Sequence, residues 1–324
     1  MLRSWSRIVL VVLLALVVAA CGAGAGGGGG NGGGDDTGGG GDGGGDGGGG
    51  GTVGSALVGF VTLSESISVG FGNTRDVDVD AVFFATSQAV VDAVVAAGPS
   101  PAVGACFVTT SSSEVDFGGG FEIPTVPPSV DGTLTFVDAG ESLTLGAETE
   151  YTVLDRRSIG TVIVYDDAFD DDVDAPAPPA GLILTIPGAT GGFPAGTVAI
   201  ADVAAMSLTS PAAIGDPTLP SIPVTAETVF TWAPPPAGAP TSHVSLFAGQ
   251  LSFDSSFQAF YRYVECTAPD NGSFEFPAAT KTILDESFNG NLIEFKRVAR
   301  EVKTVAGATV IVEVERGSFS PNVF

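Results

Sequence analysis

Val77-Asp78-Val79-Asp80-Ala81-Val82-Phe83 is the stretch that decides the fold class of this 324-residue chain. Its first four residues alternate between a β-branched apolar and a charged side chain, the period of a strand with one buried face. Similar short apolar runs recur along the chain, separated by turn residues such as Asp131-Gly132 and Asn271-Gly272. This short spacing favours antiparallel sandwiches over alternating strands and helices. The sequence therefore predicts an all-β fold, with strands at 57–63, 77–83, 133–137, 161–165, 182–186, 198–203, 228–232, 243–247, 257–266, 292–298 and 309–315.

Two segments break the strand pattern. Residues 87–97 are rich in Ala and Val and stop before Gly98-Pro99, as a short helix does. Residues 277–284 begin with a proline, which suits the first turn of a helix. A further local signal is Asn271-Gly272, which predicts a hairpin between the strand ending near Cys266 and residues 273–276.

An acidic block followed by a proline-rich piece occupies residues 166–180. Both features resist packing, and the prolines stiffen the connection. The sequence therefore predicts two sandwich-like β domains, at 53–165 and 181–324, joined by this linker. The alternative is one large sandwich in which residues 166–180 form a surface loop.

The N-terminus has the three parts of an export signal. Arg3 and Arg7 precede an uncharged run, Ile8–Ala20, which ends in small residues. The run is 13 residues long, whereas a membrane-spanning helix needs about 20. Residues 1–20 are therefore predicted to be a signal peptide and not a permanent anchor.

Val18-Ala19-Ala20-Cys21 resembles the lipobox of bacterial lipoproteins. The resemblance implies cleavage before Cys21, which would then carry a diacylglycerol and an N-acyl chain such as palmitate. Two or three acyl chains make a durable anchor, because one chain alone binds a bilayer only marginally. Gly22 differs from the Asp that retains some of these proteins in the inner membrane. The resemblance therefore implies a cell-envelope location outside the cytoplasm, with the outer membrane or cell surface favoured.

Residues 21–52 are predicted to be a flexible tether behind that anchor. Between Gly22 and Gly51, 22 of 30 residues are glycine, so there are almost no side chains to bury. We expect this disordered segment to hold the β domains away from the lipid surface.

The chain is strongly acidic. It carries 12 Lys and Arg against 37 Asp and Glu, and loss of Arg3 and Arg7 with the signal leaves 10 − 37 = −27. Such a charge repels nucleic acid and anionic lipid headgroups. The membrane is therefore expected as a partner only through the lipid, and a protein or envelope polymer remains an unidentified partner.

Two cysteines, Cys106 and Cys266, lie outside the lipobox. In an oxidising exterior they are predicted to form a disulfide. The alternative is two separate buried thiols, one in each domain.

Two sets of residues are candidate ligand sites. A hard cation such as Ca²⁺ would relieve the repulsion within a dense carboxylate run, although a solvated linker is the commoner form of such a run. Tyr261 and Tyr263 lie on one face of a predicted strand, where they could stack on a glycan or simply pack against neighbouring strands. The carboxylates of the run are Asp166, Asp167, Asp170, Asp171, Asp172 and Asp174.

Residues 229–235, VFTWAPP, followed by His243-Val244-Ser245-Leu246, resemble a fibronectin type III or immunoglobulin-like module. In those modules a core tryptophan precedes a proline-containing turn and the next strand. The resemblance implies a sandwich and no particular activity.

The residue types argue against several enzyme classes. His243 is the only histidine, which excludes zinc sites with several histidines, and no serine lies in a G-x-S-x-G elbow. The predicted function is a membrane-anchored envelope module for structure or interaction, not an enzyme and without a cofactor. The first alternative is a lipoprotein that binds calcium or a glycan, and the second is an envelope glycosidase with an unidentified carboxylate pair.

Overall fold

A computed structural model describes most of the chain downstream of the glycine-rich segment. The described residues are 55–68, 74–111, 134–167, 175–206, 208–211, 224–253, 259–284, 288–290 and 292–321.

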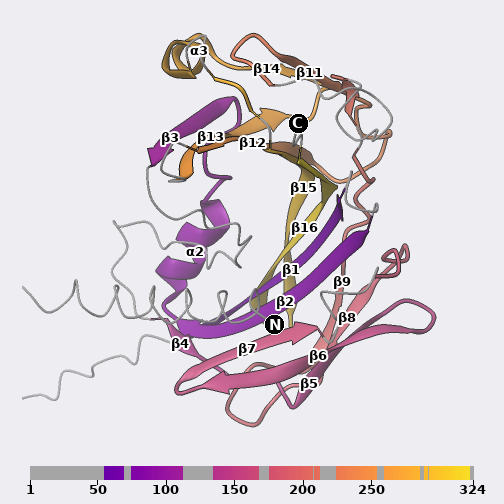
Figure 1. Ribbon diagram of the computed structural model, residues 1–324. Helices are drawn as coiled ribbons and strands as arrows, with labels where there is room; N and C mark the ends of the chain where they lie inside the picture. The colour runs from indigo at the N-terminus through magenta and orange to yellow at the C-terminus, as the bar shows by residue number, and fades with distance from the viewer. Residues whose placement is uncertain are drawn as a thin grey trace, which may run out of the picture.

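The chain folds around one large sheet, as the all-β prediction required. Its strands follow the order β3-β13-β12-β15-β16-β1-β2-β7-β6-β5-β8-β9, and β4 pairs with β2. Figure 1 shows these strands arching from β3 at the top to β5 at the bottom, with α2 on one side of the arch and β8 and β9 on the other. The strands are β1 (Ala56–Ser68), β2 (Arg75–Thr86), β3 (Ala105–Ser111), β4 (Thr135–Phe136), β5 (Ser142–Gly146), β6 (Glu150–Ile159), β7 (Val162–Asp167), β8 (Ile183–Ile186), β9 (Gly196–Ala199), β12 (Ser242–Phe253), β13 (Ala259–Pro269), β15 (Leu292–Val305) and β16 (Ala308–Pro321).

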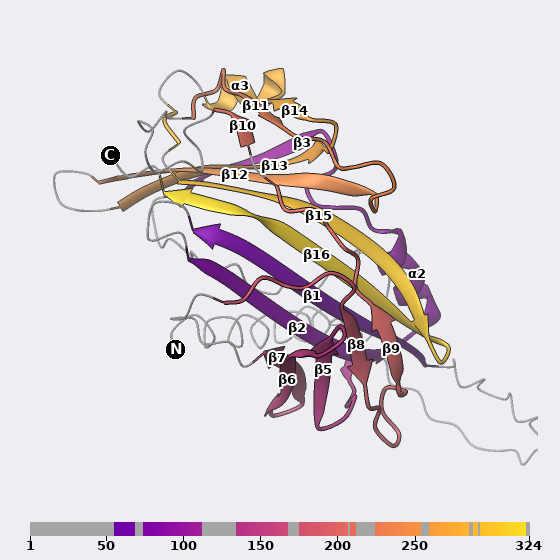
Figure 2. The ribbon, with the colours of Figure 1, turned by 90° about the vertical axis from the view of Figure 1, so that its right-hand side faces the viewer.

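The first and last strands meet in the middle of this sheet. β1 pairs with β2 in antiparallel fashion and with β16 in parallel. β15 and β16 form a long hairpin whose turn, Ala306-Gly307, has two positive φ angles, 46° and 89°. Such a turn matches the twist of the flanking strands. Figure 2 shows these long strands lying side by side across the molecule.

The burial of β2 explains why its sequence changes from alternating to continuously apolar. Val77 and Val79 are buried, whereas Asp78 between them is partly exposed. From Ala81 to Phe84 every residue is buried, because α2 (Gln88–Ala96) covers the second face of the sheet there. Alternation thus marks the half of the strand with one covered face.

α2 lies within the helix predicted at 87–97. Ser87 caps its first turn by accepting a hydrogen bond from the Val90 N–H. At the other end, the Arg300 guanidinium donates to the carbonyls of Val94 and Ala97 at 2.8 and 2.9 Å. A cation at this position satisfies terminal carbonyls and complements the helix dipole.

The face of the sheet opposite α2 buries two separate apolar clusters. The first core lies between β1, β2 and β16 and the strands β5 to β9, with side chains such as Leu63, Leu154 and Val312. The second core lies between β12, β13 and β15 and a separate three-stranded sheet with α3. The elements that cover the second core are β10 (Leu208–Ser210), β11 (Val229–Trp232), β14 (Ser273–Glu275) and α3 (Ala278–Leu284).

A row of charged side chains separates the two cores. Glu65, buried on β1, accepts from Arg75 at 2.9 Å and also pairs with Arg316 of β16. Arg316 lies opposite Arg297 of β15, and the two donate to the carbonyls of Val203 and Ala204 at 2.9 and 3.1 Å. The row therefore fixes the segment that connects β9 to β10.

The segment predicted as a linker does not divide the sheet. Strands from both sides of 166–180 are hydrogen-bonded to one another, as β5 is to β8 and β1 to β16. The large sheet therefore includes strands from both sides of this segment. Local spacing could not decide between the two-domain prediction and its one-sandwich alternative, because both contacts join strands that are far apart in the chain.

The predicted hairpin at Asn271-Gly272 was wrong. The turn is present and Gly272 has a φ of 98°, but β13 pairs with β3 and β12 while β14 pairs with β11. The reason is that β12 and β3 already occupy the two edges of β13, so no edge remains for β14.

Candidate functional site

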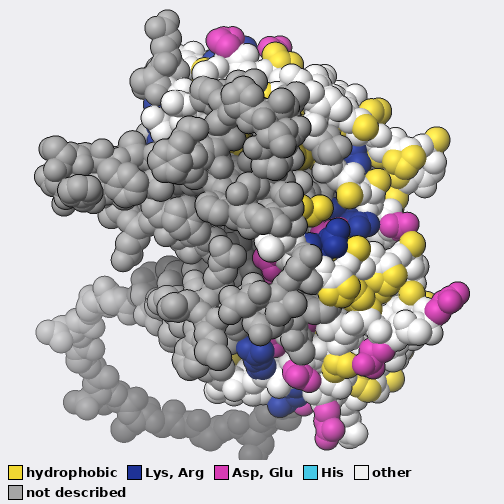
Figure 3. Space-filling model, turned by 45° about the vertical axis from the view of Figure 1, so that its right-hand side comes forward, with side chains coloured by type: hydrophobic (Ala, Val, Ile, Leu, Met, Phe, Trp, Pro, Cys, Tyr) yellow, Lys and Arg dark blue, Asp and Glu magenta, His cyan; other side chains and the backbone are white. Residues whose placement is uncertain are grey.

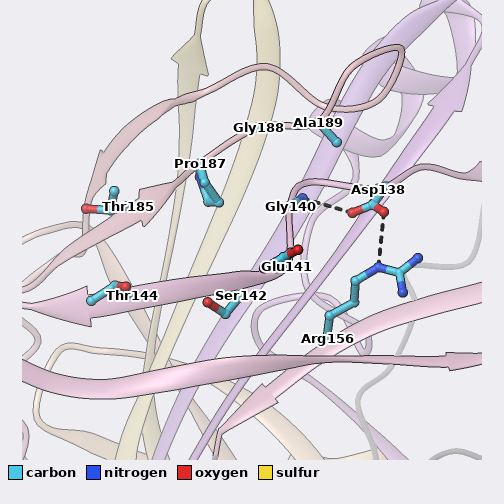
Figure 4. A pocket seen from close by; sticks show the side chains of 10 residues that line it. All are labelled: Asp138, Gly140, Glu141, Ser142, Thr144, Arg156, Thr185, Pro187, Gly188 and Ala189. Atoms are coloured by element: carbon cyan, nitrogen blue, oxygen red, sulfur yellow. Dashed lines mark hydrogen bonds and ion pairs between the residues drawn. The ribbon is translucent and has the colours of Figure 1, made fainter.

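A hollow of about 710 Å³ opens at one end of β5. Figure 4 shows its lining side chains coming from β5, from Arg156 of β6, from Thr185 of β8 and from the loops at 138–141 and 187–189. Thr144 and Thr185 are direct partners in the β5–β8 pair, so their side chains lie on the same face. The lining residues are Asp138, Gly140, Glu141, Ser142, Thr144, Arg156, Thr185, Pro187, Gly188 and Ala189.

Asp138 is the most closely held of these side chains. Its Oδ1 accepts from the Gly140 N–H at 2.9 Å and from the Tyr165 hydroxyl at 2.8 Å, and its Oδ2 lies 3.1 Å from Arg156 Nε. Partial burial alone would raise the pKa of Asp138, but these hydrogen bonds and the arginine charge outweigh it and lower the pKa. Asp138 is therefore an ionised carboxylate in a fixed orientation.

Tyr165 supports this carboxylate from inside the first core. The side chain is fully buried, and its hydroxyl accepts from the Ala139 N–H at 2.8 Å while donating to Asp138. Burial is the main cause that raises the pKa of Tyr165 to about 12. The hydroxyl therefore stays protonated as a donor at neutral pH.

Glycines allow the two rim loops to touch. Gly140 has a φ of 125°, and a Cβ there would collide with the Pro187 side chain. Gly188 has a φ of 79° and donates from its N–H to the Ala139 carbonyl at 2.9 Å. The Phe193 N–H donates to the Asp138 carbonyl at 2.7 Å. The rim is thus held by backbone contacts that leave no room for a side chain.

Several polar groups in the hollow have no partner among the described residues. They are the hydroxyls of Ser142, Thr144 and Thr185, the Glu141 carboxylate and the two terminal nitrogens of Arg156. Donors and acceptors therefore face one open space, with two carboxylates against one guanidinium.

The two cysteines lie directly opposite each other on β3 and β13. They form a disulfide, with Cα atoms 4.1 Å apart and 160 residues between them in sequence. Cys266 is fully buried in the second core. The bond therefore links edge strand β3 covalently to β13.

The carboxylate run is only partly described. Asp166 pairs with Arg157 at 2.7 Å, and Asp167 accepts from the Val79 N–H at 2.6 Å. Asp170, Asp171, Asp172 and Asp174 lie outside the described residues. Among the residues that are described, no three acidic, histidine or cysteine side chains come together as a metal site.

The predicted glycan platform is described only at Tyr263. Its ring packs 5.5 Å from the ring of Phe247 on the neighbouring strand, the cross-strand contact that was the alternative to stacking on a glycan. Tyr261 lies on β13 and pairs with Leu251 and Ser111 in register, and its side chain is outside the described set. His243 is a strand residue of β12, and burial lowers its pKa below 6.5.

A second aspartate–arginine pair, which sequence reasoning missed, is buried beside the second core. Asp270 and Arg297 lie 2.6 Å apart with side chains 2% and 4% exposed. Asp270 also accepts from Trp232 Nε1 at 2.8 Å and from the Ser242 hydroxyl at 2.6 Å. Buried Trp232 was predicted as a core residue, but nothing in the local sequence indicated its acidic partner 38 residues away.

On the part of the face in Figure 3 that is not grey, acidic side chains stand apart among hydrophobic and uncharged ones. Cys21 and the rest of residues 1–54 lie outside the described residues. Within the described ranges, no helix has the length and apolar character needed to cross a membrane.

Comparisons with known proteins identify no family. No protein-family model matches the chain, and no curated protein matches it. Among solved structures, the Fcho1 Mu homology domain of Danio rerio with bound Eps15 peptide aligns with 82% of this chain and 97% of its own. The identity is 8% and the TM-score 0.20, so this similarity supports neither a fold assignment nor a function.

Proposed function

We propose that this protein is a lipid-anchored module of the bacterial cell envelope, held at Cys21 and extended by the glycine-rich tether, which presents its β unit for interaction. The observation that carries the proposal is the export signal ending in Val18-Ala19-Ala20-Cys21. Acyl chains on Cys21 would fix the chain to a membrane without a spanning helix.

The disulfide supports a location outside the cytoplasm. Disulfides persist in oxidising compartments and are reduced in most cytosols. The Cys106–Cys266 bond lies in the sheet itself, with Cys266 fully buried. A sheet built around such a bond fits an exported protein.

The test compares the full-length protein with its Cys21→Ser variant, both expressed in a bacterial host. We expect the unmodified protein in the membrane fraction and labelled by radioactive palmitate. The variant should lose the label, because no acyl chain can be attached. Absence of label on the Cys21 protein, or label that persists in the variant, would refute the lipid anchor.

Glycoside hydrolysis is the weaker alternative for the hollow. A glycosidase needs one carboxylic acid whose pKa is raised, so that it can protonate the leaving group. Asp138 has the opposite shift, because three donors stabilise its ionised form. Asp138 is therefore suited to accepting hydrogen bonds from a ligand and not to acting as a general acid.

A further inference from the structure

We infer that the hollow at the end of β5 is a binding site for a neutral oligosaccharide. The inference adds a ligand class to the proposed interaction role. It rests on that proposed function only for the cellular location in which the protein would meet the ligand. Nothing in the sequence indicated this site, because its residues come from three separate segments between Asp138 and Ala189.

The size of the hollow suits a small ligand. Its volume of about 710 Å³ lies within the range of about 300–1,000 Å³ that is usual for small-molecule sites. Pro187 and Ala189 give the hollow an apolar wall. The C–H face of a sugar ring packs against such a wall while its hydroxyls point to polar groups.

The polar groups match a ligand whose hydroxyls both donate and accept. Glu141 can only accept when ionised, Arg156 can only donate, and the three hydroxyls can do either. All of these groups keep free hydrogen-bonding capacity within the described part of the chain. A polyhydroxylated ligand would satisfy the acceptor and the donor at the same time.

The charge of the lining disfavours an anionic ligand. Asp138 and Glu141 outnumber Arg156 in the lining, so the hollow carries a net charge of about −1 when all three are ionised. The whole chain has a formal charge of −25. An anionic ligand would therefore be repelled, and a phosphate or uronic acid is disfavoured relative to an uncharged sugar.

The site is organised before any ligand arrives. The backbone contacts between the two rim loops and the Tyr165 hydroxyl fix Asp138, which in turn orients Arg156. Binding then costs little ordering of the loops, and the terminal nitrogens of Arg156 are already directed by their neighbour.

The experiment titrates the mature lipidated protein, in a detergent without a sugar headgroup, with maltotriose and with the trisaccharide of N-acetylglucosamine. Calorimetry is expected to show saturable binding of at least one of them, and the two arms separate glucose from N-acetylglucosamine chemistry. No saturable binding of either by the folded protein would overturn the inference. Tighter binding of trigalacturonic acid would also overturn it, because that probe is anionic.

Variants test the location of the site. Arg156→Met should weaken binding by about tenfold, the effect of about 1.4 kcal/mol, and Thr144→Val with Thr185→Val should also weaken it by several-fold. The matched controls are Arg157→Met, the next residue on β6, which pairs instead with Asp166, and Thr197→Val, the exposed β9 partner of Thr185. Both controls should bind as the unmodified protein does.

Equal binding by the Arg156 and threonine variants would exclude this hollow. Circular dichroism must show that each variant is folded, and the threonine pair keeps the test open if Arg156→Met does not fold. The inference and the proposed anchor fail separately: binding is measured on purified protein, whereas anchoring is read from the membrane fraction and the palmitate label.

Discussion

Two aspartate–arginine pairs show how differently the two halves of this sheet use the same chemistry. At the second core, Asp270 and Arg297 are both almost fully buried, and Trp232, Ser242 and backbone carbonyls occupy their remaining groups. Beside the first core, Asp138 and Arg156 are 38% and 33% exposed in their side chains, and the terminal nitrogens of Arg156 have no partner among the described residues. The buried pair is committed to the fold, whereas the exposed pair remains available to a ligand.

The elements that pack over the two cores explain this difference in exposure between the two pairs. The second core is closed by a separate three-stranded sheet and α3, and it is rich in aromatic side chains such as Phe230, Phe276 and Phe295. The first core is closed by the large sheet itself as it curls from β2 to β9. The hollow lies beside the β5–β8 pair of this cover, where Ser142, Thr144 and Thr185 line it.

Neutralising Asp270 should have the largest effect on stability. Asp270→Asn leaves the Arg297 charge buried without a counter-charge, and breaking a buried pair costs about 3–5 kcal/mol. Urea unfolding should show the midpoint falling accordingly. A loss below about 1 kcal/mol would mean that the buried pair is no more important than a surface pair.

Removing the disulfide tests how much the stability of the fold depends on the covalent link between β3 and β13. Cys106→Ala with Cys266→Ala should lower the free energy of unfolding by about 2–5 kcal/mol, because the bond closes a long loop in the unfolded chain. Urea titrations with and without reductant check this. As the control, the unfolding of the double variant must not change with reductant. If reductant also leaves the unfolding of the unmodified protein unchanged, the disulfide assignment is contradicted.

Adding one methyl group to the rim tests how rigid the hollow is. Gly140→Ala introduces a Cβ at a positive φ, where it meets Pro187, and such strain costs about 1–3 kcal/mol. Ala is tolerated where space is open, so Gly98→Ala, with nothing near its Cβ, is the matched control. Equal melting temperatures for the two variants would show that the rim yields.

Acid should weaken both aspartate–arginine pairs. The effect should be larger for the buried Asp270–Arg297 pair. The pKa of Asp270 is lowered from 3.8, with burial opposing and the bonds from Arg297, Ser242 and Trp232 prevailing. A lowered pKa stabilises the fold above the unfolded value, and this contribution is lost as the pH falls from about 4 through the folded pKa. The urea midpoint of Asp270→Asn should therefore fall less between pH 5 and pH 2.5 than that of the unmodified protein.

Neutralising Asp138 should have the smallest effect on stability. The Asp138 side chain is 38% exposed. Asp138→Asn should therefore lower the free energy of unfolding by less than about 1 kcal/mol. Urea unfolding measures it beside Asp270→Asn. A loss as large as that of Asp270→Asn would erase the distinction between the two pairs.

Local sequence predicted the elements better than their partners. The alternation at Val77–Asp80 gave a strand, and the helix predicted at 87–97 contains α2. The Asn271-Gly272 hairpin failed because both edges of β13 are already paired, one of them with the distant strand β3. Local propensity contains no information about such a distant contact.

The candidate site was beyond prediction for a similar reason. None of its polar residues stands out in sequence, since single Ser, Thr and Arg residues on strands are ordinary surface residues. Only the register between β5 and β8, together with the contact of the loops at 138–141 and 187–189, brings them to one hollow.

The sequence by itself determined the all-β class and the positions of most strands and of the two helices among the described residues, because period-two alternation and helix-start signals are local properties of the chain. The tertiary structure alone decided that β1 lies beside β16, that one sheet crosses residues 166–180, and that one aspartate–arginine pair is buried while the other faces an open hollow. Burial and strand partnership depend on contacts between distant segments, which no single stretch of the chain encodes.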